Sequence, residues 1–230
     1  MYSADNLIYF SQTSSTNDQA CLYPHNSILI AETQASGRGR QGRQWISSRD
    51  GLYFTYRKEA HASIASTGLL SLIAGIALHQ VLSEYDSGLK LKWSNDLLNM
   101  KGQKLAGILI ERKAQMILIG VGVNLSSSQE LPESASSLSG NQDKIYLALK
   151  ILDHIQACLK LTQEQVVSYW QEHSFFKSGD LVNITQNDSV STYQYLGINQ
   201  EGGLKLLDQG GLEKIIYSGE VQKVRLVVPK

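Results

Sequence analysis

The sequence has few cysteines and no excess of either charge, and each shortage excludes a class of protein. Cys21 and Cys158 are the only cysteines among 230 residues and show no C-x-x-C spacing, so we expect neither a disulfide framework nor a zinc site. Lysine and arginine together number 21, as do aspartate and glutamate, and the pI is near 7.0. The chain as a whole therefore has no general attraction for nucleic acid or for an anionic membrane.

Long apolar runs are also missing. The N-terminus has no basic segment followed by an apolar one, and the longest apolar stretch, residues 69–82, is interrupted by serine, glycine, histidine and glutamine. We therefore expect a cytoplasmic protein that neither spans nor binds a membrane. A content of 42 % hydrophobic and 18 % charged residues is ordinary for a soluble enzyme with one sizeable core and a small appendage.

The most distinctive stretch is rich in glycine and arginine. It reads Gly37-Arg38-Gly39-Arg40-Gln41-Gly42-Arg43, and residues 33–49 contain four arginines and no acidic residue. Glycine lets backbone N–H groups approach a ligand closely, and guanidinium groups bind phosphate or carboxylate with two parallel hydrogen bonds. The segment therefore predicts a site for a phosphate-bearing small molecule, with a solvated basic loop as the alternative.

The three glycines of this segment also satisfy G-x-G-x-x-G, the dinucleotide-binding fingerprint. That fingerprint requires a helix that begins within the glycines. Here the following residues are polar and irregular, and 51–56 is predicted to be another strand. No G-K-[ST] follows either, so neither a dinucleotide fold nor a P-loop is predicted.

Hydrophobic periodicity divides residues 1–176 into strands and helices. Residues 89–93 alternate as a strand does, and residues 66–85 carry an apolar face wide enough to cover a sheet. Residues 104–111 and 116–124 are predicted to form an antiparallel pair at the centre of the sheet. The other predicted strands are 7–10, 27–32 and 51–56, and the other predicted helices are 14–23, 144–161 and 162–173.

The composition changes after Phe176. Short strand-like segments separated by glycine, asparagine or aspartate follow, which predicts a small β-barrel. We therefore divide the chain into a catalytic domain, 1–176, and a small C-terminal domain, 177–230. The strands predicted in the second domain are 181–185, 190–198, 204–207, 212–217 and 221–228.

Several motifs occur in a characteristic order along the chain. They are Ser14-Ser15-Thr16-Asn17, the arginine-rich segment, Lys92-Trp93-Ser94-Asn95-Asp96-Leu97, Lys104-Leu105-Ala106-Gly107-Ile108-Leu109-Ile110-Glu111 and Gly120-Val121-Gly122-Val123-Asn124-Leu125. This set closely resembles the biotin protein ligases, the biotin–acetyl-CoA-carboxylase ligase family. The resemblance covers essentially the whole chain and extends to Ser218-Gly219-Glu220-Val221. One departure is Ser94, because the family usually has K-W-P-N-D.

The resemblance implies an α+β fold. A mixed or antiparallel central sheet would be covered by helices, as in class II aminoacyl-tRNA synthetases, and followed by an SH3-like barrel. Because the chain starts directly at the catalytic domain, without the helix-turn-helix domain of regulatory members, the resemblance implies neither a repressor role nor a DNA partner. The implied partner is a biotin carboxyl carrier protein of a carboxylase, and we expect a monomer or a weak homodimer.

The implied reaction has two steps. The biotin carboxylate attacks the α-phosphorus of ATP to give biotinoyl-5′-AMP and pyrophosphate, and a lysine amine of the acceptor then displaces AMP. ATP and biotin are the expected substrates and Mg²⁺ is the expected ion. Such chemistry depends on pre-placed positive charge rather than on an enzyme nucleophile.

The resemblance also assigns roles to residues, with Lys104 and Arg40 as the catalytic cations. The implied biotin-binding residues are Ser15, Thr16, Asn17, Gln34, Gly37, Arg38, Lys104 and Gly107. The implied ATP- or adenylate-binding residues are Arg38, Arg40, Arg43, Trp45, Asn95, Asp96 and Asn124. Mg²⁺ would be bound mainly through substrate phosphates, with Asn95 and Asp96 as candidate ligands.

Alternatives stay open at this point. A lipoate ligase would share the core fold, but its loop resembles R-R-x-x-G-G-G rather than alternating Gly-Arg. A non-catalytic biotin or biotinoyl-AMP sensor is disfavoured by the presence of Lys104, Arg40 and Asn95. Residues 14–17 would serve equally as simple helix caps, and Trp45 as simple core packing.

Overall fold

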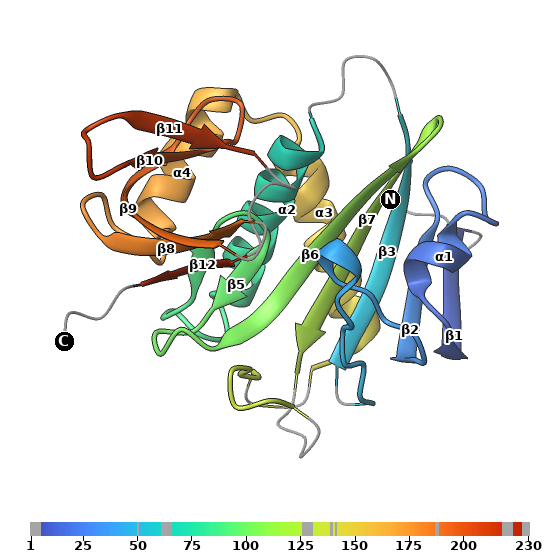
Figure 1. The fold of residues 1–230 in the computed structure, drawn as a ribbon. Helices are drawn as coiled ribbons and strands as arrows, with labels where there is room; N and C mark the ends of the chain where they lie inside the picture. Colours follow the sequence, from blue (N-terminus) through green and yellow to red (C-terminus); the bar gives the residue numbers. More distant parts are fainter. Residues whose placement is uncertain are drawn as a thin grey trace.

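The computed structural model describes residues 6–49, 51–60, 66–125, 131–138, 140, 142–186, 189–217 and 223–226. Within these residues the chain forms a seven-stranded sheet, four α-helices and a second, five-stranded sheet (Figure 1). The first sheet has the order β1-β2-β3-β7-β6-β5-β4, and only β1 and β2 are parallel. Its strands are β1 (Leu7–Thr13), β2 (Ile28–Gln34), β3 (Gly51–Glu59), β4 (Lys90–Lys92), β5 (Asp96–Leu98), β6 (Lys104–Lys113) and β7 (Met116–Asn124).

Strand β7 is the middle strand of this sheet and pairs along its length with β3 and β6. Its sequence is almost continuously apolar or small, as expected of a strand that is covered on both faces. On one face, the core residues Ile119 and Val121 of β7 join Ile108 of β6. On the other face, Gly120 and Gly122 leave the backbone bare, and this difference between the faces positions the site described below.

Helices α2 (Thr67–Leu82) and α3 (Lys144–Cys158) cover the apolar face, behind β6 and β7 in Figure 1. Helix α2 is buried almost all round because it lies between the sheet and α3. Helix α4 (Gln163–His173) begins with a capping box formed by Thr162 and Gln165. The short α1 (Thr16–Ala20) lies on the opposite face of the sheet.

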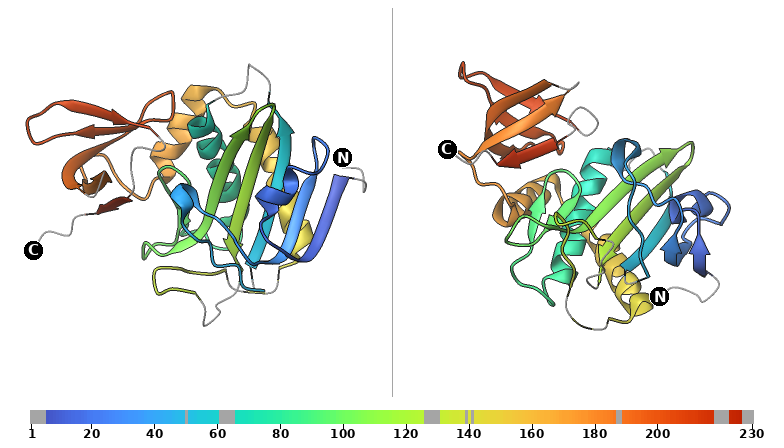
Figure 2. Two further views of the ribbon diagram at one scale, coloured as in Figure 1. Left: turned by 45° about the vertical axis from the view of Figure 1, so that its right-hand side comes forward. Right: turned by 60° about the horizontal axis from the view of Figure 1, so that its bottom comes forward.

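The second sheet lies at the other end of the molecule from β1 (Figure 2) and contacts α4 through β9. Its order is β11-β10-β9-β8-β12, and all pairs are antiparallel. Among the described residues no pairing joins the two edge strands, so this sheet is open and its predicted closure into a barrel is not confirmed. Its strands are β8 (Leu181–Gln186), β9 (Ser189–Ile198), β10 (Leu204–Leu207), β11 (Glu213–Ile216) and β12 (Lys223–Leu226).

The predicted mixed α+β class is confirmed, as is the antiparallel pairing of β6 and β7 near the centre of the sheet. Strand β5 was not predicted, and the predicted strand 89–93 is shortened to β4. The motif 218–221 lies outside the described residues. No helix in the described ranges is long and apolar enough to span a membrane.

His79 joins three elements in the core. Its ring lies 3.1 Å from the Leu89 carbonyl oxygen through Nε2 and 2.8 Å from the Tyr169 hydroxyl through Nδ1. Because a carbonyl only accepts, Nε2 carries the hydrogen and Nδ1 accepts from Tyr169. Burial, followed by the nearby His173 ring, lowers the pKa of His79 to about 4. The neutral ring therefore ties α2 to α4 and to the start of β4.

This geometry predicts an acid-sensitive contribution to stability. An unfolded histidine takes up its proton near pH 6.5, whereas the folded His79 stays neutral to about pH 4, so stability present at neutral pH is lost as the pH falls between these values. At pH 7.5 the parent should have the larger unfolding free energy. As the pH is lowered to 5, its advantage over His79→Gln should shrink by on the order of 2 kcal/mol. Urea unfolding at both pH values measures this, and a pH-independent gap would contradict it.

Candidate active site

A cavity of about 570 Å³ lies on the face of the large sheet opposite α2 and α3. This volume is typical of a small-molecule site. Its walls come from α1, the loop that follows β2, strands β5, β6 and β7, and the segment after α4. The cavity thus brings together motifs that are far apart in the sequence.

The floor of the cavity is made by Gly107, Gly120 and Gly122, here called the glycine floor. Gly107 and Gly122 are direct partners in the β6–β7 ladder. A Cβ at Gly122 would lie 2.6 Å from Cε2 of the Trp45 indole, and one at Gly107 would lie 2.9 Å from Cζ3 of the same ring. A Cβ at Gly120 would collide with the Asn17 amide. The absence of side chains is therefore what lets Trp45 and Asn17 approach the strands.

One end of the cavity is neutral and rich in hydrogen-bonding groups. The Gln34 Oε1 accepts from the Thr16 backbone N–H at 2.8 Å, and the Gln34 Nε2 donates to the Ser47 hydroxyl at 3.0 Å. The Thr55 hydroxyl, fully buried beneath α1, donates to the Asn17 Oδ1 at 2.6 Å and lies 2.8 Å from the Thr16 hydroxyl. These contacts fix several donors and acceptors without any net charge. Ser15 stands at the N-cap of α1, but its side chain makes no capping bond.

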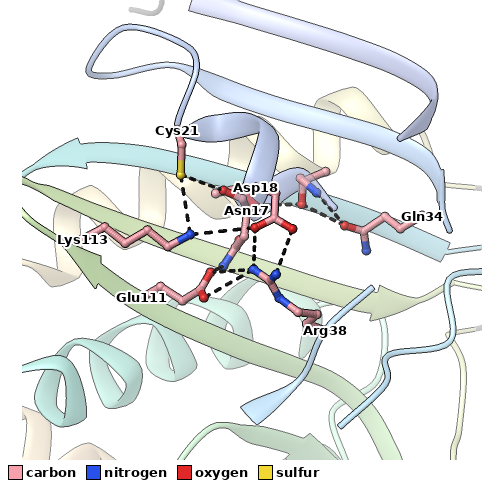
Figure 3. Close-up of polar contacts among 9 residues, drawn as sticks. Asn17, Asp18, Cys21, Gln34, Arg38, Glu111 and Lys113 are labelled. Carbon is pink, nitrogen blue, oxygen red and sulfur yellow. Dashed lines mark hydrogen bonds and ion pairs between the residues drawn. The ribbon is translucent and has the colours of Figure 1, made fainter. Parts of the chain in front are cut away.

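Arg38 is held at the rim of this end by carboxylates (Figure 3). Its guanidinium donates to both oxygens of Asp18, at 2.9 and 2.7 Å, and lies 3.4 Å from the Glu111 carboxylate. Hydrogen bonding to Asp18 is the main cause that raises the pKa of Arg38 above its ordinary value. Glu111 also accepts from the Asn17 Nδ2 at 2.7 Å. Arg38 is therefore neutralised in place and secures the loop to α1 and β6.

The other end of the cavity is cationic. The Arg40 Nη1 donates to the Ser94 hydroxyl and, at 3.1 Å, to the Asn95 Oδ1. Burial is the main cause that lowers the pKa of Arg40 from its ordinary value, and the neighbouring Asp96 opposes that shift. A guanidinium that has lost water in this way gains strongly from an anionic ligand.

Lys104 completes the cationic end. Its ammonium lies 2.6 Å from the Asp96 Oδ1 and 5.0 Å from the centre of a Trp45 ring. The side chain bends over Gly107, since a Cβ there would lie 3.0 Å from the Lys104 Nζ. Asp96 thus lies between two cations, and Trp45 covers the floor beside them. The Trp45 Nε1 is buried and has no hydrogen-bond partner among the described residues.

Comparison with known proteins points to one family for both the fold and the motifs. The model of the biotin/lipoate A/B protein ligase family matches residues 9–124, which include every motif that lines the cavity up to β7. The chain belongs to this family.

Relatives and solved structures agree with this family. A bifunctional ligase/repressor from Bacillus spizizenii is 28% identical over 94% of this chain and 73% of its own length. A biotin–[acetyl-CoA-carboxylase] ligase from Mycobacterium tuberculosis is 27% identical over 86% of this chain and 79% of its own. The biotin protein ligase from Aquifex aeolicus, solved with biotin and ATP, superposes with a TM-score of 0.83 at 26% identity and covers 96% of this chain and 99% of its own.

The structure gathers most of the predicted site residues of this family member around one cavity. Those that line it are Ser15, Thr16, Asn17, Gln34, Arg38, Arg40, Arg43, Trp45, Asn95, Asp96, Lys104 and Gly107.

Gly37 and Asn124 are placed differently, outside the lining residues. Gly37 is packed tightly within the loop, where a Cβ would lie 2.6 Å from the Trp45 carbonyl oxygen. The Asn124 amide donates to the Lys104 and Ser136 carbonyl oxygens, at 3.3 and 3.0 Å. Asn124 therefore supports the backbone next to Lys104.

Sequence reasoning missed several residues of the site. Thr55, which organises the neutral end, lies within an ordinary strand and has no local signal. Phe175 and Phe176 line the cavity, although in the sequence Phe176 marked only the domain boundary and Phe175 had no predicted role. Gly120 and Gly122 stood within a recognised motif, and their spacing of two on a predicted strand was the signal for a bare sheet face.

The glycine floor yields a direct prediction. In Gly122→Ala the new methyl group displaces the Trp45 indole, so more tryptophan fluorescence should become quenchable by acrylamide, because Trp93 and Trp170 are buried. Gly39→Ala is the matched control, since its Cβ would meet neighbours only at 3.6 Å or more. Unchanged quenching in Gly122→Ala would show that Trp45 does not rest on the floor.

Proposed function

We propose that this chain is an ATP-dependent biotin protein ligase, which activates biotin as biotinoyl-5′-AMP and transfers it to a lysine of a biotin carboxyl carrier protein. The observation that carries the proposal is the single cavity that joins a neutral, hydrogen-bonding end to a cationic end. A ligand that fits must combine a neutral polar group with a distant anionic one. Biotin joined to the α-phosphate of a nucleotide has this form.

The dimensions of the sheet support this assignment. Gln34 belongs to β2 and Asp96 to β5, four strand positions apart in the sheet order. At about 4.8 Å per strand, the two ends are separated by roughly 19 Å. We assign the ureido ring of biotin to the end that holds Thr16, Asn17 and Gln34, because its carbonyl and N–H groups need neutral partners. The adenylate then takes the end that holds Arg40 and Asn95.

The first step joins two anions. A biotin carboxylate oxygen attacks the α-phosphorus, the bond to the β-phosphate oxygen breaks, and pyrophosphate leaves. Lys104 belongs to the cationic end but stands on β6, one strand nearer to Gln34 than Asp96 on β5. We assign its ammonium to bridge the carboxylate and the α-phosphate oxygens, while Arg40 balances charge on the phosphates. Holding both reactants in one cavity supplies the alignment that the step requires.

The second step transfers the acyl group. The neutral amine of the acceptor lysine attacks the biotinoyl carbonyl carbon, the bond to the phosphate oxygen breaks, and AMP leaves as the nitrogen loses a proton. No enzyme nucleophile is needed. A biotin carboxyl carrier protein is the acceptor in this proposal, in keeping with the printed names of relatives such as the Mycobacterium tuberculosis ligase.

The proposal includes Mg²⁺ as an ion carried by the ATP phosphates. The Asp96 Oδ1 faces Lys104 and the Asn95 Oδ1 accepts from Arg40, so we keep these two residues as secondary candidate ligands beside the phosphates. In the described residues no group of three or more histidine, cysteine, aspartate or glutamate side chains could hold a metal ion. The phosphates, rather than a protein cage, would therefore provide the charged ligands of Mg²⁺ and receive its charge.

The remaining parts of the proposal concern the whole chain. We propose a catalytic unit, 1–176, and a small C-terminal unit, 177–230, that closes as an SH3-like barrel. Specific DNA binding is not expected, because the chain has no net positive charge. A lipoate ligase is the competing assignment, and adenylate formation with lipoate instead of biotin would favour it.

Removing the Lys104 charge tests the mechanism. We expect Lys104→Gln to slow biotinoyl-AMP formation by about 10²–10³-fold, the usual cost of losing one preorganised donor. Glutamine retains a hydrogen-bond donor for the half-buried Asp96, so the variant should fold.

Lys101→Ala, a change at an exposed lysine in the preceding turn, is the control and should keep the parent rate. Single-turnover assays with biotin, ATP and Mg²⁺ give the rates. A parent-like rate in Lys104→Gln would remove Lys104 from the mechanism, and a parent that forms no biotinoyl-AMP would refute the function.

A further inference from the structure

The turn between β4 and β5 contacts the half-buried Arg40 side chain through neutral groups. The Ser94 hydroxyl and the Asn95 Oδ1 both accept from the Arg40 Nη1. This nitrogen carries two hydrogens, so the two contacts direct both of them at the turn. Neutral acceptors orient a guanidinium without cancelling its charge, in contrast to the carboxylates that hold Arg38.

Ser94 is itself firmly placed. Its side chain and backbone are 2 % exposed, and its carbonyl oxygen accepts from the Ser71 hydroxyl at 3.0 Å. On one side, the Trp93 indole donates to the Gly202 carbonyl at 2.9 Å. On the other, the Asn95 amide donates to the Ile108 carbonyl at 3.0 Å. The Ser94 hydroxyl therefore stands on a turn that α2, β6 and the second sheet all support.

We propose that Ser94 is a positioning residue for Arg40: its hydroxyl fixes the guanidinium over the cavity, so that the loop retains the acyl-adenylate until the acceptor arrives. This role rests on the proposed function. Proline, usual at this position in the family motif, has no side-chain acceptor, so the contact depends on the serine that stands here. Loss of the hydroxyl removes one of the two contacts that this turn makes with the Arg40 Nη1, so the guanidinium is held less firmly over the cavity.

The test measures retention of the intermediate. Ser94→Ala, incubated with biotin, ATP and Mg²⁺ without acceptor, should release free biotinoyl-AMP about three- to tenfold faster than the parent, the range expected for loss of one hydrogen bond. The KM for ATP should rise while the KM for biotin changes little, because the contact lies at the adenylate end. Ser94→Pro is a second hydroxyl-free variant with the same expected result.

Two further variants separate positioning from a general structural effect. Ser83→Ala removes another buried serine hydroxyl, one without a hydrogen-bond partner among the described residues, and should leave release unchanged. Combining Ser94→Ala with Arg40→Gly should add nothing to Arg40→Gly alone, because Ser94 acts through Arg40.

The outcomes separate the two proposals. Two results would overturn the role of Ser94 and leave the proposed function intact. One is parent-like release from both Ser94 variants. The other is that Ser94→Ala speeds release as much in the Arg40→Gly background as it does in the parent. A parent chain that makes no biotinoyl-AMP overturns the proposed function together with this role.

Discussion

The strip of bare backbone on β6 and β7 is the constraint on which the rest of the site depends. Side chains alternate between the two faces of a strand. This alternation directs Ile108 and Val121 into the core and leaves Gly107, Gly120 and Gly122 on the other face. Any side chain at these positions would fill the space now taken by Trp45 and Asn17. One pair of strands thus supplies both the packed core and the open floor.

The loop above this floor treats its arginines in two ways. Arg38 is half-exposed and paired with Asp18, a kind of contact that typically contributes below about 1 kcal/mol, so its role is to set the direction of the loop. Arg40 is half-buried, and its Nη1 donates to two neutral side chains, Ser94 and Asn95. Neutral acceptors orient a guanidinium without cancelling its charge. On these grounds we propose that Arg38 anchors the loop and that Arg40 binds the ligand.

Much of the fold and many of the lining residues could be predicted because their signals are local. Long apolar segments such as α2 and β7 indicate elements of the core, and the glycine–arginine segment combines charge with backbone freedom. Strand β5 has only three residues, too few to show a pattern, and forms because β6 offers it a partner. Thr55 meets Thr16 and Asn17 across 39 and 38 residues, a contact that no single-sequence pattern encodes. The position of Asn124 outside the cavity lining also depends on the fold, since its partners are backbone oxygens distant in the sequence.

The two ends of the cavity also differ in what supports them. The neutral end is held by contacts among residues 16–111, all within the large sheet and α1. The cationic end is built on the β4–β5 turn, and the Trp93 indole of that turn donates to the Gly202 carbonyl in the turn that joins β9 and β10 of the second sheet. Gly202 has a φ of +85°, and a Cβ there would lie 3.1 Å from the Leu72 side chain, so only glycine presents its carbonyl to Trp93 without strain. No described residue of the second sheet lines the cavity. The sheet nevertheless holds in place the backbone that carries Asn95 and Asp96. Binding of the neutral group and placement of the phosphates consequently depend on separate parts of the chain.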